Sequence, residues 1–155
     1  METGKACRGV TLIELCIVIA VLAALLGISW PVLRGVAAGS ELENDCKRLS
    51  ATILYARDSA IAENRRYRLS FDPQKHWYAL SAESGEPGDF EPVGSAEFST
   101  RKWSQNTGAT DISGKELVFN PDGSAENFRI VLKNSKGRAI ELTYDNLKGK
   151  CEISK

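Results

Sequence analysis

Glu14 is the residue whose type and position most clearly suggest chemistry, because it places a carboxylate at the start of an apolar run. Leu15–Trp30 follows it with almost no interruption by polar residues. About 20 apolar residues are enough to cross the hydrocarbon core of a bilayer. An ionisable group at the edge of such a segment costs free energy unless it finds a partner. The sequence therefore predicts that Glu14 has a specific partner.

The residues around Glu14 combine a basic leader, a glycine, a glutamate and an apolar helix. Arg8-Gly9 is followed by Val10-Thr11-Leu12-Ile13-Glu14-Leu15. This pattern resembles the class III leader junction of type IV prepilins and type II secretion pseudopilins. The resemblance implies that a membrane-embedded prepilin peptidase cuts after Gly9 and methylates the amine of Val10, where phenylalanine is more usual. It also implies that Glu14 governs assembly by neutralising the Val10 amine of a neighbouring subunit.

Two other kinds of segment share parts of this pattern. A secretory signal peptide also has a basic start, here Lys5 and Arg8, and Gly35-Val36-Ala37 offers a poor cleavage site after the apolar core. The apolar run is longer than a usual signal core and has Glu14 at its start, which argues against a signal peptide. A plain single-span anchor is the second alternative.

The chain of 155 residues is long enough for one modest domain beyond the apolar run. Lys5 and Arg8 precede the run, which fits a cytoplasmic leader, and Trp30 suits the outer membrane interface. We therefore expect a single-pass protein of the cell inner membrane with its C-terminal domain in the periplasm. The expected parts are a leader peptide, the transmembrane half of an N-terminal helix in contact with lipid, and a periplasmic domain: residues 1–9, 10–33 and 34–155.

Residue types that build metal sites and catalytic triads are sparse. The chain has four cysteines and one histidine, with no Cys-x-x-Cys or Cys/His spacing that suggests zinc. Ser59 and His76 lack a third partner for nucleophilic catalysis. We expect no enzymatic activity, no metal and no cofactor. Cys46 and Cys151 are the thiols expected in the outer domain, and the sequence leaves open whether they form a disulfide.

The helical pattern continues beyond the apolar run. Apolar residues recur at alternating steps of four and three, as on a helix with one buried face. They are Leu42, Cys46, Leu49, Ile53, Ala56 and Ala60. One helix is predicted from Val10 to about Arg65, where the basic cluster Arg65-Arg66-Arg68 suits the dipole of a helix end. Pro31 should kink this helix or remove one of its backbone hydrogen bonds.

After Arg66 the apolar period changes to two residues, which is typical of strands. Tyr67–Phe71 and Trp77–Leu80 indicate a hairpin around Asp72-Pro73, and residues 84–94 indicate a loop. Further strands are predicted at residues 97–103, 116–120, 127–133, 138–144 and 150–154. The expected fold class is α+β, with the amphipathic half of a long N-terminal helix packed on an antiparallel β-sheet.

Two later segments narrow the resemblance. Tyr55–Arg65 and Leu117–Ser124 resemble a helix end and a Pro-Asp-Gly turn of the pseudopilin H and FimT group. This resemblance implies a minor pseudopilin of the type II secretion system, which takes part in protein export across the outer membrane. The implied partners are the prepilin peptidase and other pseudopilins in a helical filament.

The alternative within the same group is a FimT-like minor type IV pilin that binds DNA during uptake or primes pilus assembly. Binding to nucleic acid would need a basic surface. The formal net charge is zero, and Glu141, Asp145 and Glu152 interrupt the basic residues of the last quarter of the chain. The sequence therefore favours the secretion subunit over the DNA-binding pilin.

Overall fold

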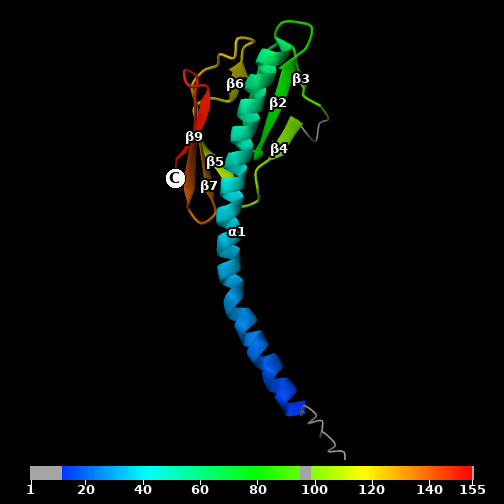
Figure 1. Cartoon of the computed structure of the whole chain (residues 1–155), viewed down its shortest axis with the longest axis vertical. Coiled ribbons are helices and arrows are strands. Elements are labelled where there is room, and N and C mark those ends of the chain that lie inside the picture. Colours follow the sequence, from blue (N-terminus) through cyan, green and yellow to red (C-terminus); the bar gives the residue numbers. More distant parts are fainter. Residues whose placement is uncertain (1–11, 95–98, 155) are drawn as a thin grey trace, which may run out of the picture. The chain divides into compact units, whose positions relative to one another are not determined.

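The computed structural model describes residues 12–94 and 99–154, and the side chains of these residues outside 26–39. The chain divides into two compact units, Met1–Ala37 and Ala38–Lys155. Helix α1 (Leu12–Glu63) contributes residues to both units (Figure 1). Its bounds agree with the prediction of one helix from Val10 to about Arg65.

In the first unit, α1 carries apolar side chains on all of its faces. Eight large ones between Leu12 and Leu22 are each 49–81% exposed. Such a helix has no polar face to present to water, so it requires apolar surroundings on every side. Among the residues that the structure describes, no helix meets the length and apolarity needed to cross a membrane.

In the second unit, the predicted apolar stripe of α1 is its buried face. All six members, from Leu42 to Ala60, have an exposed fraction of 0%. Asn64 follows the helix with a φ of 51°. Asparagine accepts this left-handed conformation more readily than most residues, so it ends the helix there. The prediction of an amphipathic helix with this face in the core is confirmed.

Five strands form the first antiparallel sheet of the second unit. They are β1 (Tyr67–Asp72), β2 (Trp77–Glu83), β3 (Phe90–Pro92), β4 (Thr100–Lys102) and β6 (Glu116–Phe119). The order is β3-β2-β1-β6, and β4 also pairs with β2. Leu69 of β1 is aligned with Leu80 of β2 and with Leu117 of β6, which sets the register of the apolar face.

Four strands form the second antiparallel sheet. They are β5 (Thr107–Ile112), β7 (Phe128–Asn134), β8 (Ala139–Asp145) and β9 (Lys150–Ser154), in the order β5-β7-β8-β9. Alternate residues of β7 and β8 are buried, as expected for a sheet with one face in the core. The rings of Phe71 and Phe128 stack 4.8 Å apart and join the two sheets within one core.

Three details differ from the sequence-based expectations. The single expected sheet is two sheets, and the second of them contains β5, a strand that the sequence did not indicate. Residues 84–94, predicted as a loop, contain the short strand β3. The basic cluster Arg65-Arg66-Arg68 lies after the helix, since no basic residue occupies the last turn of α1.

Candidate assembly site

The described part of the candidate site begins with Glu14 in the first turn of α1. The N-terminus of a helix carries a partial positive charge, so an acidic side chain is favourable in this turn. Glu14 is exposed and is flanked by Ile13 and Leu15, whose exposed fractions are 69% and 55%. Over residues 12–25, the described side chains of the first unit, the helix therefore presents one carboxylate within a largely apolar surface. Gly9 and Val10, and the side chain of Pro31, lie outside the described residues.

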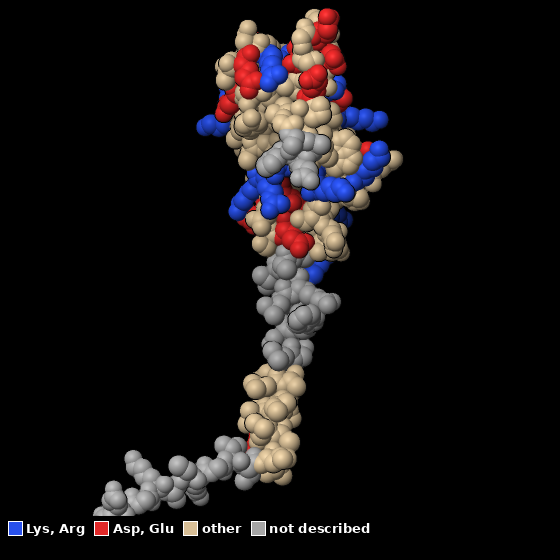
Figure 2. All heavy atoms as spheres, turned by 90° about the vertical axis from the view of Figure 1, so that its right-hand side faces the viewer, with Lys and Arg blue, Asp and Glu red and all other residues tan. Residues whose placement is uncertain are grey.

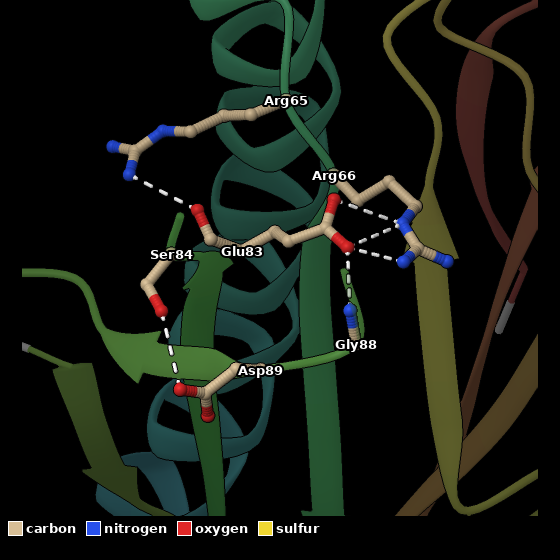
Figure 3. Close-up of polar contacts among 6 residues, drawn as sticks. All are labelled: Arg65, Arg66, Glu83, Ser84, Gly88 and Asp89. Carbon is tan, nitrogen blue, oxygen red and sulfur yellow. Dashed lines mark hydrogen bonds and ion pairs between the residues drawn. The ribbon is translucent and has the colours of Figure 1, made fainter. Parts of the chain in front are cut away.

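The opposite end of α1 is fastened to the first sheet by an ion pair that the sequence did not reveal. Arg66 follows the helix and contacts Glu83 at the end of β2, with its Nε 3.0 Å from each carboxylate oxygen (Figure 3). Its Nη2 also donates to Oε1 of Glu83. The backbone N–H of Gly88 donates to the same oxygen at 2.8 Å. Glu83 thus joins the helix end to the loop between β2 and β3.

The electrostatics of Glu83 follow from these donors. The hydrogen bonds from Arg66, followed by that from the Gly88 N–H, lower the pKa of Glu83 from 4.5 to about 2. Hydrogen bonds to the charged form of a carboxylate stabilise that form. Glu83 is therefore ionised over the whole range in which proteins normally function.

The remaining arginines of the cluster also have defined partners. Arg65 pairs with Glu63, and its Nη1 lies 3.5 Å from the backbone oxygen of Glu83. The guanidinium of Arg68 lies 4.2 Å from the centre of the Phe90 ring, a cation–π contact that links β1 to β3 across the intervening strand β2. These contacts replace the simple helix-dipole role that the sequence suggested.

Arg57 lies beneath two turns of the second unit. A Cβ added at Gly149 would be 3.1 Å from Cζ of Arg57, and one added at Gly123 would be 3.7 Å from its Nε. Both glycines have positive φ angles, of 60° and 79°. The positive charge of the nearby Arg57 also opposes the rise in the pKa of Tyr144 that burial causes. Arg57 is therefore half-buried, whereas an arginine on a helix is usually solvated.

Cys46 and Cys151 both contact the core of the second unit, and both thiols are free in this structure. Burial, with smaller contributions from Asp45 and Glu43, raises the pKa of the Cys46 thiol to about 11. Burial raises the pKa of the Cys151 thiol, and Ser50, one helical turn beyond Cys46, opposes this rise. A bond between the two cysteines stays a prediction that non-reducing peptide mapping would decide.

The described residues contain no group of three His, Cys, Asp or Glu side chains that could hold a metal ion. His76 lies in the turn between β1 and β2 with a φ of 56°, and its ring is 3.5 Å from the Cβ position of Gly108. Ser59 is buried on α1. The structure places these two residues on different elements, the β1–β2 turn and α1.

Comparison with known proteins gives matches along most of the chain. Residues 45–147 match the family described as Type II transport protein GspH, and residues 4–30 match the prokaryotic N-terminal methylation motif. The chain is similar to type II secretion system protein H of Pseudomonas aeruginosa, with 24% identity over 93% of this chain and 94% of that protein.

Two solved structures have the same fold. The minor pseudopilin EpsH from the type 2 secretion system of Vibrio cholerae matches with a TM-score of 0.62 and 11% identity, over 74% of this chain and 96% of that chain. The type IV minor pilin FimU of Pseudomonas aeruginosa matches with a TM-score of 0.58 and 14% identity, over 75% and 90% of the two chains. Because the GspH match spans more than half of the 155 residues, the chain belongs to the GspH family of type II transport proteins.

Proposed function

We propose that this chain is a minor pseudopilin of a type II secretion system and takes part in the export of proteins across the outer membrane. The observation that carries the proposal is the GspH match over residues 45–147 on a chain that also matches the methylation motif over residues 4–30. Its role is that of a structural subunit in a filament with other pseudopilins.

In this proposal the prepilin peptidase removes residues 1–9, residues 10–33 insert into the inner membrane, and residues 34–155 lie in the periplasm. The exposed apolar side chains between Leu12 and Leu22 support insertion. Removing apolar surface from water is favourable by roughly 25 cal/mol per Å². Mass spectrometry of the mature protein is then expected to show methylated Val10 as its first residue.

Glu14 pairs with the methylated amine of Val10 on a neighbouring subunit as the helix leaves the bilayer. Two opposite charges attract strongly at low dielectric, whereas either one alone is costly to bury. Because an unpaired buried charge is costly, adjacent helices favour the one axial register that brings the carboxylate of Glu14 and the amine of Val10 together. The exposed position of Glu14 in the first turn of α1 supports the pairing, because the carboxylate is accessible to a second chain.

The test is a Glu14→Leu variant in a strain that lacks the native gene. The substitution makes the helix more apolar, so membrane insertion should survive. Secretion should nevertheless fall to the level of the empty strain, because the Val10 amine loses its partner. Cys16→Ala, a change on the same exposed segment, is the control and should restore secretion. Normal secretion by Glu14→Leu would contradict the assembly role.

A FimT-like minor type IV pilin is the second candidate, and the shared fold with FimU favours it. Such a subunit would prime pilus assembly or bind DNA during uptake. A salt-dependent shift of duplex DNA by the purified protein would support this candidate. Its absence, together with a secretion defect, would support the pseudopilin.

A further inference from the structure

Four segments of the second unit meet at the end where α1 enters it, and we call this the proximal end. They are residues 41–48 of α1, the turn at 72–76, the loop at 101–106 and the turn at 133–138. Asn106 donates from its side chain to Glu41 at 3.0 Å, and its backbone oxygen accepts the N–H of Ser135 at 2.9 Å. Ser104 donates its N–H to Asp45 at 2.9 Å. These bonds hold three of the segments together.

The turn at 72–76 joins the same end through the backbone, where the N–H of Trp103 donates to the oxygen of His76 at 3.0 Å. The proximal end is therefore one continuous surface built from both sheets and the helix. Its shape is fixed by hydrogen bonds among the four segments.

The proximal end has an excess of positive charge. Its four segments contain eight Lys or Arg and four Asp or Glu. All four acids have a recorded partner: Glu41 and Asp45 accept the bonds from Asn106 and Ser104 given above, and the other two pair with lysines. Glu43 lies 3.2 Å from Lys47, and Asp72 lies 3.7 Å from Lys75.

Six of the basic residues at the proximal end are exposed and have no ion pair within the described part of the chain. They are Arg48, Arg101, Lys102, Lys133, Lys136 and Arg138. The last three belong to the β7–β8 turn and its flanking strand residues. Their charges are therefore available to an external anion.

The other end of the second unit, which we call the distal end, has the opposite charge. It consists of residues 57–66, 83–91, 120–127 and 145–149, which contain four Lys or Arg and nine Asp or Glu. In Figure 2 acidic side chains gather at the top of the unit, where α1 ends, and most of the basic side chains on the visible face lie lower. The unit is thus electrically polarised along α1.

The chain length limits how far the proximal end can lie from the bilayer. Glu41 is eight positions beyond Leu33, the end of the proposed membrane segment. This stretch spans about 12 Å as a helix and at most roughly 27 Å when extended. Electrostatic attraction to a charged surface extends over a Debye length of about 8 Å at physiological ionic strength. The tether is therefore long enough for the basic end to come within this range of the headgroups.

We propose that the proximal end docks on the anionic phospholipid headgroups of the membrane that holds the subunit before it enters the filament. The inference rests on the proposed membrane anchor. Lys102, Lys133, Lys136 and Arg138 face the headgroups, and the acidic distal end is directed away by repulsion. Docking thus orients the stored subunit with its distal end, the surface formed by Glu83 and the turns around Arg57, directed into the periplasm.

The experiment measures the rate at which an amine-reactive reagent modifies individual lysines of the full chain in vesicles. A surface potential of about −30 mV concentrates protons about threefold at the membrane. It therefore slows the reaction of a docked lysine about threefold, because only the neutral amine reacts. Lys136 should react about threefold more slowly in vesicles with about 30% phosphatidylglycerol than in zwitterionic vesicles. Lys148, at the distal end, should react equally fast in both.

A double variant, Lys133→Gln with Arg138→Gln, should remove most of the slowing at Lys136. The matched control, Lys148→Gln with Lys150→Gln, removes the same charge from the β8–β9 region and should leave the slowing intact. About 0.5 M NaCl, which shortens the Debye length to roughly 4 Å, should also abolish it.

The outcomes separate docking from anchoring. A chain that does not float with the vesicles contradicts the membrane anchor itself. A chain that floats but shows equal Lys136 rates in both lipids, or equal slowing in the two double variants, overturns the docking alone. Slowing of Lys136 by duplex DNA on zwitterionic vesicles, with no slowing by anionic lipid, would overturn it in favour of a nucleic acid partner.

Discussion

Glu83 accepts hydrogen bonds from a residue just after α1 and from the loop that follows β2, so one carboxylate fixes the position of two segments. Its sequence context gave no signal for this, because the partner Arg66 is 17 residues away and the Gly88 donor is a backbone group. The roles of Arg66 and Gly88 emerge only when β1 and β2 pair. Such a contact depends on register rather than on local pattern.

The pH dependence of stability tests the Glu83 contacts. The pKa of Glu83 is lowered from 4.5 to about 2, so its contribution is fully present above pH 4.5 and is lost as the pH falls through 2. In the Glu83→Gln variant the free energy of unfolding should be lower than in the wild type at pH 7. Between pH 4.5 and pH 2 it should change less than it does in the wild type. Urea titration of the protein in mild detergent measures this, with Glu86→Gln as the matched charge control. If the free energy of unfolding changed with pH in the same way in Glu83→Gln and in the wild type, this would contradict the lowered pKa of Glu83.

Gly149 tests the position of Arg57. An alanine at a positive φ costs about 1–2 kcal/mol by itself, and this applies equally to Gly149 at 60° and Gly137 at 84°. A Cβ at Gly149 would also press on Arg57 at 3.1 Å, whereas Gly137 has nothing within 4 Å. Gly149→Ala should therefore lose about 1 kcal/mol more than Gly137→Ala in thermal or urea unfolding.

The Arg57→Ala background provides the control for this pair of glycines. Without the guanidinium, Gly149→Ala and Gly137→Ala should cost the same, because only the conformational term remains. If Gly149→Ala still cost more stability than Gly137→Ala in this background, the cause would lie elsewhere in the β8–β9 turn and not in Arg57.

At the scale of elements, patterns of period 3.6 and period 2 were sufficient to locate α1 and most strands. The buried stripe from Leu42 to Ala60 and the alternation in β7 and β8 both reflect a single face in contact with the core. Strand β5 was missed because Gly108 and Asp111 disfavour a strand and because a bulge between Ala109 and Asp111 breaks the alternation. The division into two sheets depends on which strands pair with one another, and the period of a single strand does not specify its partners, so this division could not be predicted either.

The notable charged residues of the two units were predictable to different degrees. Glu14 stands out because an acid in an apolar run is costly, and the structure places it in the first turn of α1. Arg57 did not stand out, because a helical arginine is usually solvated. Its burial follows from two glycine turns, at Gly123 and Gly149, that come from distant parts of the chain.

Leu49 tests the contribution of the helix stripe. Its side chain is fully buried, so Leu49→Ala should reduce the free energy of unfolding by about 2–5 kcal/mol. Lys47→Ala, on the exposed side of the same turn, should change it by less than about 0.5 kcal/mol. Equal effects of the two substitutions in chemical unfolding would show that α1 is not packed on the sheets as described.

At the scale of the whole molecule, the two units have different tasks in the proposed function. The described side chains of the first unit form an apolar surface with one carboxylate, Glu14, which suits insertion and then helix-to-helix assembly. The second unit is a packed α+β domain whose proximal end is basic and whose distal end is acidic. A subunit built in this way can be stored in the membrane in one orientation and then transferred to a filament.

Deletion of the gene in its own host tests the central claim most directly. The measurement is the amount of type II exoprotein in the culture medium, with twitching motility and DNA uptake measured in the same strain. We predict that deletion traps exoproteins in the periplasm, that the wild-type gene restores export, and that both pilus functions are unchanged. Normal export together with a loss of motility or uptake would contradict the account and identify the chain as a minor pilin.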